Sequence, residues 1–275
     1  DAAFLTMIGS AHLEFLKTRE NIAREKAKLL KVLQPGGMIA VHESDLSFEV
    51  MRTLPGRVIV LAEGKVSAEL PKNYEVRQMS LVDGKSGWTL TVRNSTTSLP
   101  LWTPGVAKSA ALIVTLAREM GVSAADIQSR LKSWRGVDLR GQWLKCNGGK
   151  ARIYLDAYNS NPEALTDSLW RFERMAESST RLYIIGTMAE LGGESDILHR
   201  AAMAKVPAHK NAHYICVGAQ ATLMASELIK RGLKAEVTEN LEKVKSILAQ
   251  TQGDCFIKGS NSNQLHTLST LCSPL

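Results

Sequence analysis

The second half of the chain alternates regularly between short apolar runs and amphipathic segments. Apolar runs typical of buried strands lie at residues 151–156, 181–186, 212–218, 234–238 and 254–258. Segments with helical spacing of apolar residues lie at 162–177, 195–206, 219–231, 240–250 and 263–271. Strands that alternate with helices in this way predict a parallel, doubly wound, Rossmann-like sheet.

The first half is less regular, but its pattern also predicts an α/β fold. Short strands are expected at residues 4–8 and 38–41, with a helix over residues 19–33 between them. A β-rich region follows, with strands expected over 58–62, 76–82 and 88–92. Two helices come next, over 106–120 and from Ser123 onward, and residues 134–140 have the character of a linker. We therefore expect two domains, residues 1–136 and residues 137–275.

A polar loop after the strand at 151–156 is the main candidate for chemistry. The apolar run ends in Asp156, and Tyr158, Asn159 and Asn161 follow closely. In an open α/β sheet, ligands bind at the carboxyl ends of the strands. A capped turn explains the same residues equally well, because Asn161 before a proline is a good helix N-cap. Local sequence alone leaves both interpretations open.

Two other loops follow predicted strands and carry polar residues. Glu190 lies just after the strand at 181–186, and Lys258 and Ser260 lie at the end of the strand at 254–258. Arg140 precedes the first strand of the second domain. Three such loops at one edge of a sheet make a shared binding site more plausible than any one of them.

The N-terminal region adds a histidine and a lysine. His12 follows the first predicted strand, and Lys26 lies on the next predicted helix, near an apolar stripe formed by Ile22, Leu29 and Leu30. Most single histidines and lysines are ordinary surface residues. A lysine beside an apolar stripe must extend to water, pair with an anion, or change its charge state.

Composition excludes several other classes of protein. The content of hydrophobic residues is 44% and that of charged residues 22%, as in ordinary soluble proteins, and no apolar run reaches membrane-spanning length. The four cysteines form no CxxC pair, so we expect reduced thiols, no zinc, and a cytoplasmic protein. The net charge of +7 is spread along the chain without a basic, aromatic-rich stripe, which favours anionic small molecules over nucleic acid as ligands.

Six short motifs together resemble those of the Mur ligase family, the ATP-dependent amide ligases of peptidoglycan precursor synthesis. The motifs are residues 9–14, Lys26, residues 156–162, residues 186–192, residues 198–200 and residues 258–260. The resemblance implies that residues 1–136 are the second half of a central ATPase domain. It also implies that residues 137–275 are a complete, Rossmann-like C-terminal domain.

The resemblance also implies roles for individual residues. His12 and Lys26 would be catalytic residues at a magnesium site, with Lys26 carbamylated so that it offers an oxygen ligand. Arg140 would bind the nucleotide phosphates, Asp156 the ribose, and Asn159 the nucleotide. The residues expected to bind substrate are Tyr158, Asn161, Glu190, Lys258 and Ser260.

The activity implied is the addition of D-Ala-D-Ala to UDP-MurNAc-tripeptide, with ATP and Mg²⁺ and through an acyl phosphate. The Tyr-Asn-x-Asn-Pro element at 158–162 and the Met-x-Glu-Leu-Gly element at 188–192 favour this dipeptide as the incoming amine. Neither nucleic acid nor insertion into a membrane is expected.

The chain departs from the family pattern in ways that leave alternatives open. It lacks the family's Gly-Lys-Thr/Ser phosphate loop and UDP-sugar domain, so we expect the chain alone to be inactive and to need an upstream segment. Thr187 and Asn261 stand where an aspartate and an arginine are usual. One alternative is a degenerate homologue that binds a ligand or partner without ligation. Another is a relative that ligates a different amino acid or a folate glutamate chain.

Overall fold

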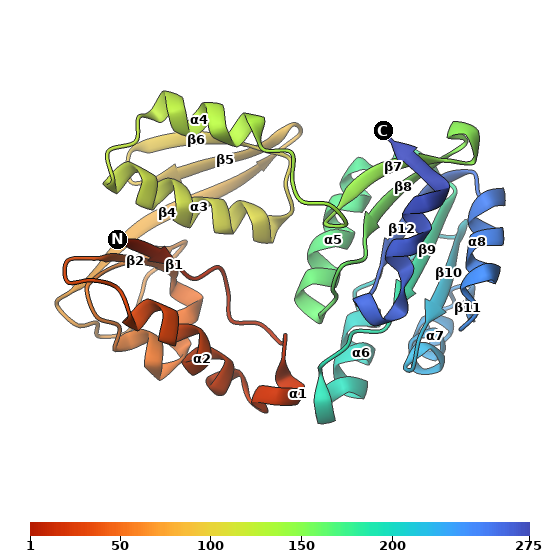
Figure 1. Ribbon diagram of the computed structural model, residues 1–275, viewed down its shortest axis with the longest axis horizontal. Coiled ribbons are helices and arrows are strands. Elements are labelled where there is room, and N and C mark those ends of the chain that lie inside the picture. The colour runs from red at the N-terminus through yellow and green to blue at the C-terminus, as the bar shows by residue number, and fades with distance from the viewer. The chain divides into compact units, whose positions relative to one another are not determined.

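The computed structural model describes residues 1–275, which form two compact units (Figure 1). Unit 1 consists of Asp1–Gly9 and Leu16–Trp134, and unit 2 of Ser10–Phe15 and Arg135–Leu275. Unit 2 therefore includes a short N-terminal segment that the sequence pattern assigned to the first domain. No helix is long and apolar enough to cross a membrane.

Unit 1 is built on a six-stranded sheet in the order β1-β2-β3-β4-β5-β6. The strands are β1 (Ala2–Phe4), β2 (Met38–His42), β3 (Arg57–Ala62), β4 (Tyr74–Gly84), β5 (Gly87–Val92) and β6 (Ser95–Pro100). The first four are parallel, and β5 and β6 are antiparallel additions. The helices are α2 (Arg19–Lys31), α3 (Pro104–Glu119) and α4 (Ala124–Ser133), with short 3₁₀ turns η1 (Glu43–Ser47) and η2 (Glu49–Arg52).

The first strand does not lie where the sequence predicted it. Residues 4–8 were expected to be a strand, but pairing with β2 ends at Phe4 and the backbone of residues 6–8 leaves the sheet. Side chains of α2 donate hydrogen bonds to the carbonyl groups of this segment. Lys26 Nζ donates to the Met7 carbonyl at 2.6 Å, and Arg19 donates to the Ile8 carbonyl at 2.7 Å. These bonds replace the ladder that a strand would need.

Unit 2 is built on a seven-stranded sheet in the order β11-β10-β9-β12-β8-β7-β13. The strands are β7 (Gln142–Cys146), β8 (Ala151–Asp156), β9 (Arg181–Gly186), β10 (Ala212–Val217), β11 (Ala235–Val237), β12 (Gly253–Lys258) and β13 (Cys272–Pro274). Strands β8 to β12 are parallel, which confirms the predicted doubly wound sheet. The antiparallel edge strands β7 and β13 were not predicted.

Helices cover both faces of this sheet (Figure 1). The helices are α5 (Pro162–Met175), α6 (Ser195–Ala204), α7 (Ala221–Lys230) and α8 (Leu241–Gln250), and the 3₁₀ turns are η3 (Asn147–Gly149), η4 (Gly192–Glu194), η5 (Asn261–Asn263) and η6 (Leu265–Leu271). The short helix α1 (Leu13–Leu16) does not cover the sheet. Apolar side chains of α5, α6 and α7 pack in one core, and those of α8 and η6 pack in another. The helix expected over 263–271 is instead the 3₁₀ turns η5 and η6, separated by Gln264 with a left-handed φ of 56°.

An aromatic cluster fixes α5 on the sheet. Phe172 of α5 is fully buried, and its ring centroid lies 5.4 Å from that of Phe256 and 5.5 Å from that of Tyr183. Burying and pairing large rings in this way contributes several kcal/mol, since truncating such a residue typically costs about 3–5 kcal/mol. The position of the N-terminus of α5, and of the loop before it, follows from this packing.

The cysteines correct one expectation. Cys146 and Cys272 lie directly opposite each other on β7 and β13 and form a disulfide, so the prediction of four reduced thiols is wrong for this pair. The pairing depends on the register of two edge strands, which the spacing of cysteines does not reveal. Cys216 and Cys255 are free and buried, as expected, and burial raises the pKa of Cys216 to about 12.

Candidate functional site

The carboxyl ends of three neighbouring strands bring three polar loops together in unit 2. Strand β12 lies between β8 and β9, with Lys258 paired in register with Asp156 on one side and with Ile185 on the other. The loops that leave these strands therefore start side by side. This arrangement is the topological position at which doubly wound sheets bind ligands.

A buried ion pair ties two of these loops. Lys258 is 1% exposed, and its Nζ donates to Asp156 Oδ2 at 2.9 Å and to the Asn159 carbonyl at 3.0 Å. Ser168 of α5 donates to the same carboxylate oxygen. Burial lowers the pKa of Lys258, and the charge of Asp156 opposes that shift. Lys258 thus orients the loop after β8, and its predicted direct contact with substrate stays a prediction.

The loop after β8 combines a capped turn with an exposed aromatic platform. Asn161 Oδ1 accepts from the Ala164 amide at 2.7 Å, so Asn161 is the N-cap of α5. Asn159 Oδ1 accepts from the Ser160 amide at 2.8 Å. Tyr158 is 53% exposed, and the Arg140 guanidinium lies 4.2 Å from its ring centroid. The capped-turn interpretation therefore explains Asn161, whereas the side chains of Arg140 and Tyr158 remain available to a ligand.

The loop after β9 is tied to the loop after β12. Ala189 donates its amide to Ser260 Oγ at 2.8 Å, and the Ser260 amide donates to the Thr187 carbonyl at 3.3 Å. Asn263 Nδ2 also donates to Thr187 Oγ1 at 2.9 Å. A Cβ on Gly186 would lie 2.5 Å from Asn263 Oδ1, so Asn263 requires a glycine at that strand end. Nothing in the local sequence of residues 261–263 predicts this contact.

The N-terminal segment of unit 2 adds His12 to the loop after β9. His12 Nδ1 lies 2.5 Å from Glu190 Oε2, and the Glu14 amide donates to the Glu190 carbonyl at 2.9 Å. Ser10 Oγ donates to Glu163 Oε1 at 2.7 Å, at the first turn of α5. Two residues predicted from motifs far apart in the sequence, His12 and Glu190, therefore lie in contact.

Lys26 belongs to unit 1, unlike the other predicted site residues. Of the apolar stripe predicted around it, Ile22 and Leu30 are buried, but Leu29 is 67% exposed. The charge of Lys26 acts on Asp45, whose pKa is raised to about 6 mainly by burial, although bonds from the His42 and Ile8 amides and the nearby cations oppose the shift. Lys26 thus lies near a buried acid.

The residues present do not complete a magnesium site. His12 and Glu190 offer one nitrogen and carboxylate oxygens, whereas Mg²⁺ prefers an octahedron of oxygens. No group of three or more histidine, cysteine, aspartate or glutamate side chains is placed to hold a metal ion. Carbamylation of Lys26 stays a prediction.

A cavity of about 240 Å³ opens at the carboxyl ends of β2 and β3 in unit 1. Its lining includes His42, Glu43 and Glu63, and Lys108 of α3. Lys108 Nζ lies 3.7 Å from Glu63 Oε1, and Glu43 Oε1 accepts from the Glu63 amide at 3.0 Å. Two carboxylates beside one ammonium do not make a cradle for phosphate groups.

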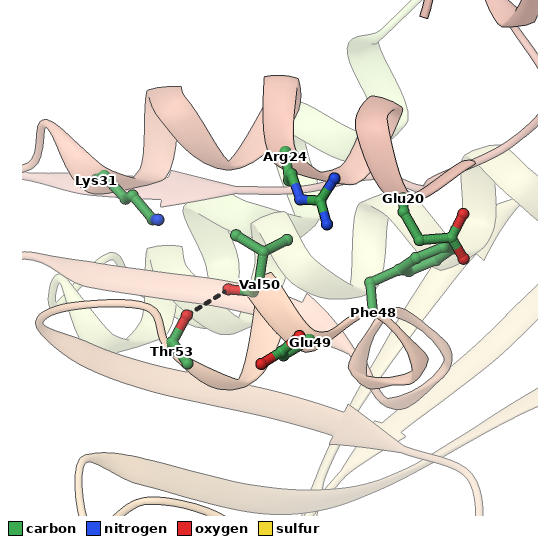
Figure 2. Close-up of a pocket in the computed structure, with 7 residues that line it drawn as sticks. All are labelled: Glu20, Arg24, Lys31, Phe48, Glu49, Val50 and Thr53. Atoms are coloured by element: carbon green, nitrogen blue, oxygen red, sulfur yellow. Dashed lines mark hydrogen bonds between the residues drawn. The ribbon is translucent and has the colours of Figure 1, made fainter. Parts of the chain in front are cut away.

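A second cavity of unit 1, about 300 Å³ in volume, lies between α2 and the turn at Phe48 to Thr53. Figure 2 shows Arg24 and Lys31 along one wall and the Thr53 hydroxyl donating to the Val50 carbonyl on the other. None of the predicted site residues lines this cavity.

Comparison with known proteins decides the family. The Mur ligase middle domain matches residues 1–96, and the Mur ligase, glutamate ligase domain matches residues 139–260. The chain belongs to the Mur ligase family. This confirms the resemblance of the motifs and the two-part α/β fold.

This Mur ligase chain matches two curated relatives that have the same name. It is 21% identical over 243 residues to UDP-N-acetylmuramoyl-tripeptide–D-alanyl-D-alanine ligase of Bacillus subtilis, covering 88% of this chain and 51% of that protein. The same enzyme of Treponema pallidum is 25% identical over 285 residues, covering 98% of this chain and 57% of that protein. The chain thus spans about half the length of these curated relatives.

A solved structure supports the fold at the same low identity. The MurF ligase of Thermotoga maritima in complex with ADP superposes with a TM-score of 0.71 at 21% identity, covering 98% of this chain and 61% of that one. At this identity the likeness establishes the fold of the Mur ligase chain and leaves its substrates to be argued from its own residues.

Proposed function

We propose that this chain is a portion of an ATP-dependent amide-bond ligase of peptidoglycan precursor synthesis, made up of part of the central ATPase domain and the C-terminal domain. The ligase would add D-Ala-D-Ala to UDP-MurNAc-tripeptide. The observation that carries the proposal is the set of interlocked loops after β8, β9 and β12, where Lys258 is bonded to Asp156 and Ser260 is bonded to Ala189. The names of the two curated relatives support the choice of substrates.

The reaction proposed is activation of a carboxylate followed by attack of an amine. ATP transfers its γ-phosphoryl group to the tripeptide carboxylate, which forms an acyl phosphate and releases ADP, so that phosphate becomes the leaving group. The amine of the dipeptide then forms the new C–N bond as the C–O bond to phosphate breaks, and the amine loses a proton. Such chemistry needs cationic groups to bind the phosphates and closure to exclude water.

Residues of unit 2 suit the nucleotide side of this reaction. Arg140 is oriented by the Tyr158 ring and offers a planar fork of donors to phosphate oxygens. Asp156 uses Oδ2 for Lys258 and Ser168, which leaves Oδ1 for a ribose hydroxyl. We assign Asn159 to the nucleotide, and Tyr158, Asn161, Glu190, Lys258 and Ser260 to the substrate side as before.

We also propose that a further segment supplies the phosphate loop. The sequence of the chain has no Gly-Lys-Thr/Ser motif, and the cavity at the ends of β2 and β3 is lined by two glutamates. Mg²⁺ is expected from the family, with His12 and Lys26 as its predicted ligands. Because those side chains do not complete a site, no catalytic step is assigned to the metal.

The deciding experiment measures phosphate release from ATP by the complete gene product, with UDP-MurNAc-tripeptide and D-Ala-D-Ala. We expect release that requires both substrates and falls about a hundredfold or more in Asp156→Ala. Glu239→Ala, which removes an exposed carboxylate of unit 2, is the matched control and should keep full activity. Absence of release from a folded protein would favour the non-catalytic homologue, and release with a different amine would favour the relative that ligates another amino acid.

A further inference from the structure

Three consecutive amides hold the loop after β9 on three different partners. The Thr187 amide donates to the Val217 carbonyl at 2.9 Å, and the Ala189 amide donates to Ser260 Oγ. Between them, the Met188 amide donates to His199 Nε2 at 2.9 Å. The partners of Thr187 and Ala189 belong to the sheet and its loops, whereas the partner of Met188 is a side chain of α6. The next residue along the loop is Glu190.

The bonds of His199 define its protonation state. His199 is 0% exposed, and its Nδ1 lies 2.7 Å from the Ser195 carbonyl oxygen, which can only accept. Nδ1 therefore carries the proton, and Nε2 is the acceptor for Met188. An imidazolium has no acceptor nitrogen, so this pair of bonds requires the neutral ring.

The surroundings of the ring favour that neutral form. Burial lowers the pKa of His199, and the Ser195 carbonyl and the charge of Asp196 oppose the shift. On α7, which packs on α6, Glu227 is bonded to Arg200 and Lys230. On α5, Glu163 is bonded to Ser10.

Glu190 depends on the loop that His199 holds. Its φ is +62°, a left-handed conformation that costs a non-glycine residue about 1–2 kcal/mol and persists only when neighbours enforce it. Met188 is 2% exposed, so its amide has no water to turn to if His199 is lost. A free Met188 amide would therefore release the strain at Glu190 by moving the loop.

We propose that His199 is a positioning residue which, as a neutral hydrogen-bond acceptor, fixes the loop that presents Glu190 to the amine substrate. The assignment of Glu190 to that substrate rests on the proposed function. His199 itself touches no reacting atom. A histidine that merely filled the core would need its volume but not its acceptor nitrogen.

Two substitutions separate these roles. In His199→Gln the side-chain carbonyl can reach the position of Nε2 and accept from Met188, whereas His199→Leu keeps apolar volume and removes the acceptor. The experiment records amide hydrogen exchange of Met188 and Ile184 and the imidazole ¹⁵N shifts of His199, by NMR on the whole chain at pH 7. Ile184, in the middle of β9, reports whether the sheet is intact.

We expect the Nδ1–H tautomer in the wild type and exchange of Met188 about tenfold faster in His199→Leu, as for loss of one backbone hydrogen bond. His199→Gln should restore the wild-type rate to within about threefold, and Ile184 should be unchanged in all three proteins. The Nε2–H tautomer, or equal exchange at Met188 in the Leu and Gln variants, would overturn the proposal. If His199→Leu also changes the exchange of Ile184, the tautomer of the wild type and the exchange of Met188 in His199→Gln still test the proposal.

In the complete ligase, His199→Leu should raise KM for D-Ala-D-Ala by about tenfold while kcat falls less, and His199→Gln should restore KM. The exchange measurement needs no substrate. If the exchange results hold and the ligase assay shows no dipeptide-dependent turnover, then the proposed function fails and the positioning role of His199 stands. If turnover occurs but the exchange of Met188 is unchanged in His199→Leu, then the positioning role of His199 fails and the proposed function stands.

Discussion

Both units carry polar residues at the carboxyl ends of their parallel strands, but the two sets are fixed in different ways. In unit 2, Lys258 is 1% exposed and bonded to Asp156 and Asn159. In unit 1, Lys108 and Glu63 are about half exposed and 3.7 Å apart. The residues of unit 2 hold one another before any ligand binds. The exposed Lys108–Glu63 pair of unit 1 has no such support, so a ligand that used these side chains would have to order them and bear the entropic cost.

The largest expected difference comes from removing one carboxylate in each unit. Asp156→Ala leaves the Lys258 ammonium buried without its anion, and should lower the free energy of unfolding of unit 2 by about 3–5 kcal/mol. Glu63→Ala removes an exposed partner and should cost less than about 1 kcal/mol in unit 1. Urea unfolding of both variants measures the contrast. Equal losses in the two variants would show that the two strand ends are supported alike.

The disulfide sharpens the comparison, because it lies only in unit 2. Cys146 and Cys272 are separated by 126 residues, so the bridge closes most of the unit into one loop. Cys272→Ser should lower the free energy of unfolding of unit 2 by about 2–5 kcal/mol and leave that of unit 1 unchanged. Urea unfolding followed separately for the two units tests this. Wild-type protein treated with a dithiol is the control, and it should match the variant.

Sequence patterns predicted the centre of unit 2 well and its edges poorly. Strands β8, β9, β10 and β12 are apolar runs buried on both faces, so their positions along the chain follow from the sequence. Strands β7 and β13 are short edge strands whose pairing, and with it the disulfide of Cys272, depends on tertiary register. The pairing register of such edge strands produces no periodic pattern of apolar residues, so the sequence does not predict it.

The candidate site was predicted by residue type but not by connection. Asp156 and Lys258 could be found because each ends a strand, and Glu190 because it lies in the loop after one. The acceptor role of His199 depends on where the Met188 amide points, and the donor role of Asn263 depends on glycines at the neighbouring strand ends. Contacts of this kind depend on the tertiary structure of the loops, so the sequence alone does not predict them.

The stability of unit 1 should depend on pH through Asp45. The folded-state pKa of Asp45 is raised to about 6 from 3.8, so the native state binds this proton more tightly than the unfolded state does. The stability of unit 1 should therefore fall as the pH rises from about 4 to about 6, by about 2–3 kcal/mol from this group. Asp45→Asn should remove that part of the fall and be the more stable protein at pH 7.5.

Urea unfolding at pH 4.5 and pH 7.5 checks this prediction. Glu69→Gln, at an exposed position of the same unit, is the control and should keep the wild-type dependence. A wild-type stability that rises over this range, with Asp45→Asn unchanged, would mean that Asp45 is stabilised as a carboxylate by Lys26 and Arg19 more than burial penalises it.

The smallest effect on stability is expected at Tyr158, an exposed residue of the unit 2 site. Tyr158 is 53% exposed, and its stack with Arg140 should contribute no more than about 1 kcal/mol. Tyr158→Ala should therefore unfold almost as the wild type does, yet weaken ADP binding to the complete gene product several-fold, because Arg140 loses the ring that orients it. Calorimetric titration of wild type, Tyr158→Ala and Tyr158→Phe measures this, and the Phe variant should retain most of the affinity. If Ala binds ADP as tightly as the wild type does, Arg140 is oriented by other contacts and the platform has no part in nucleotide binding.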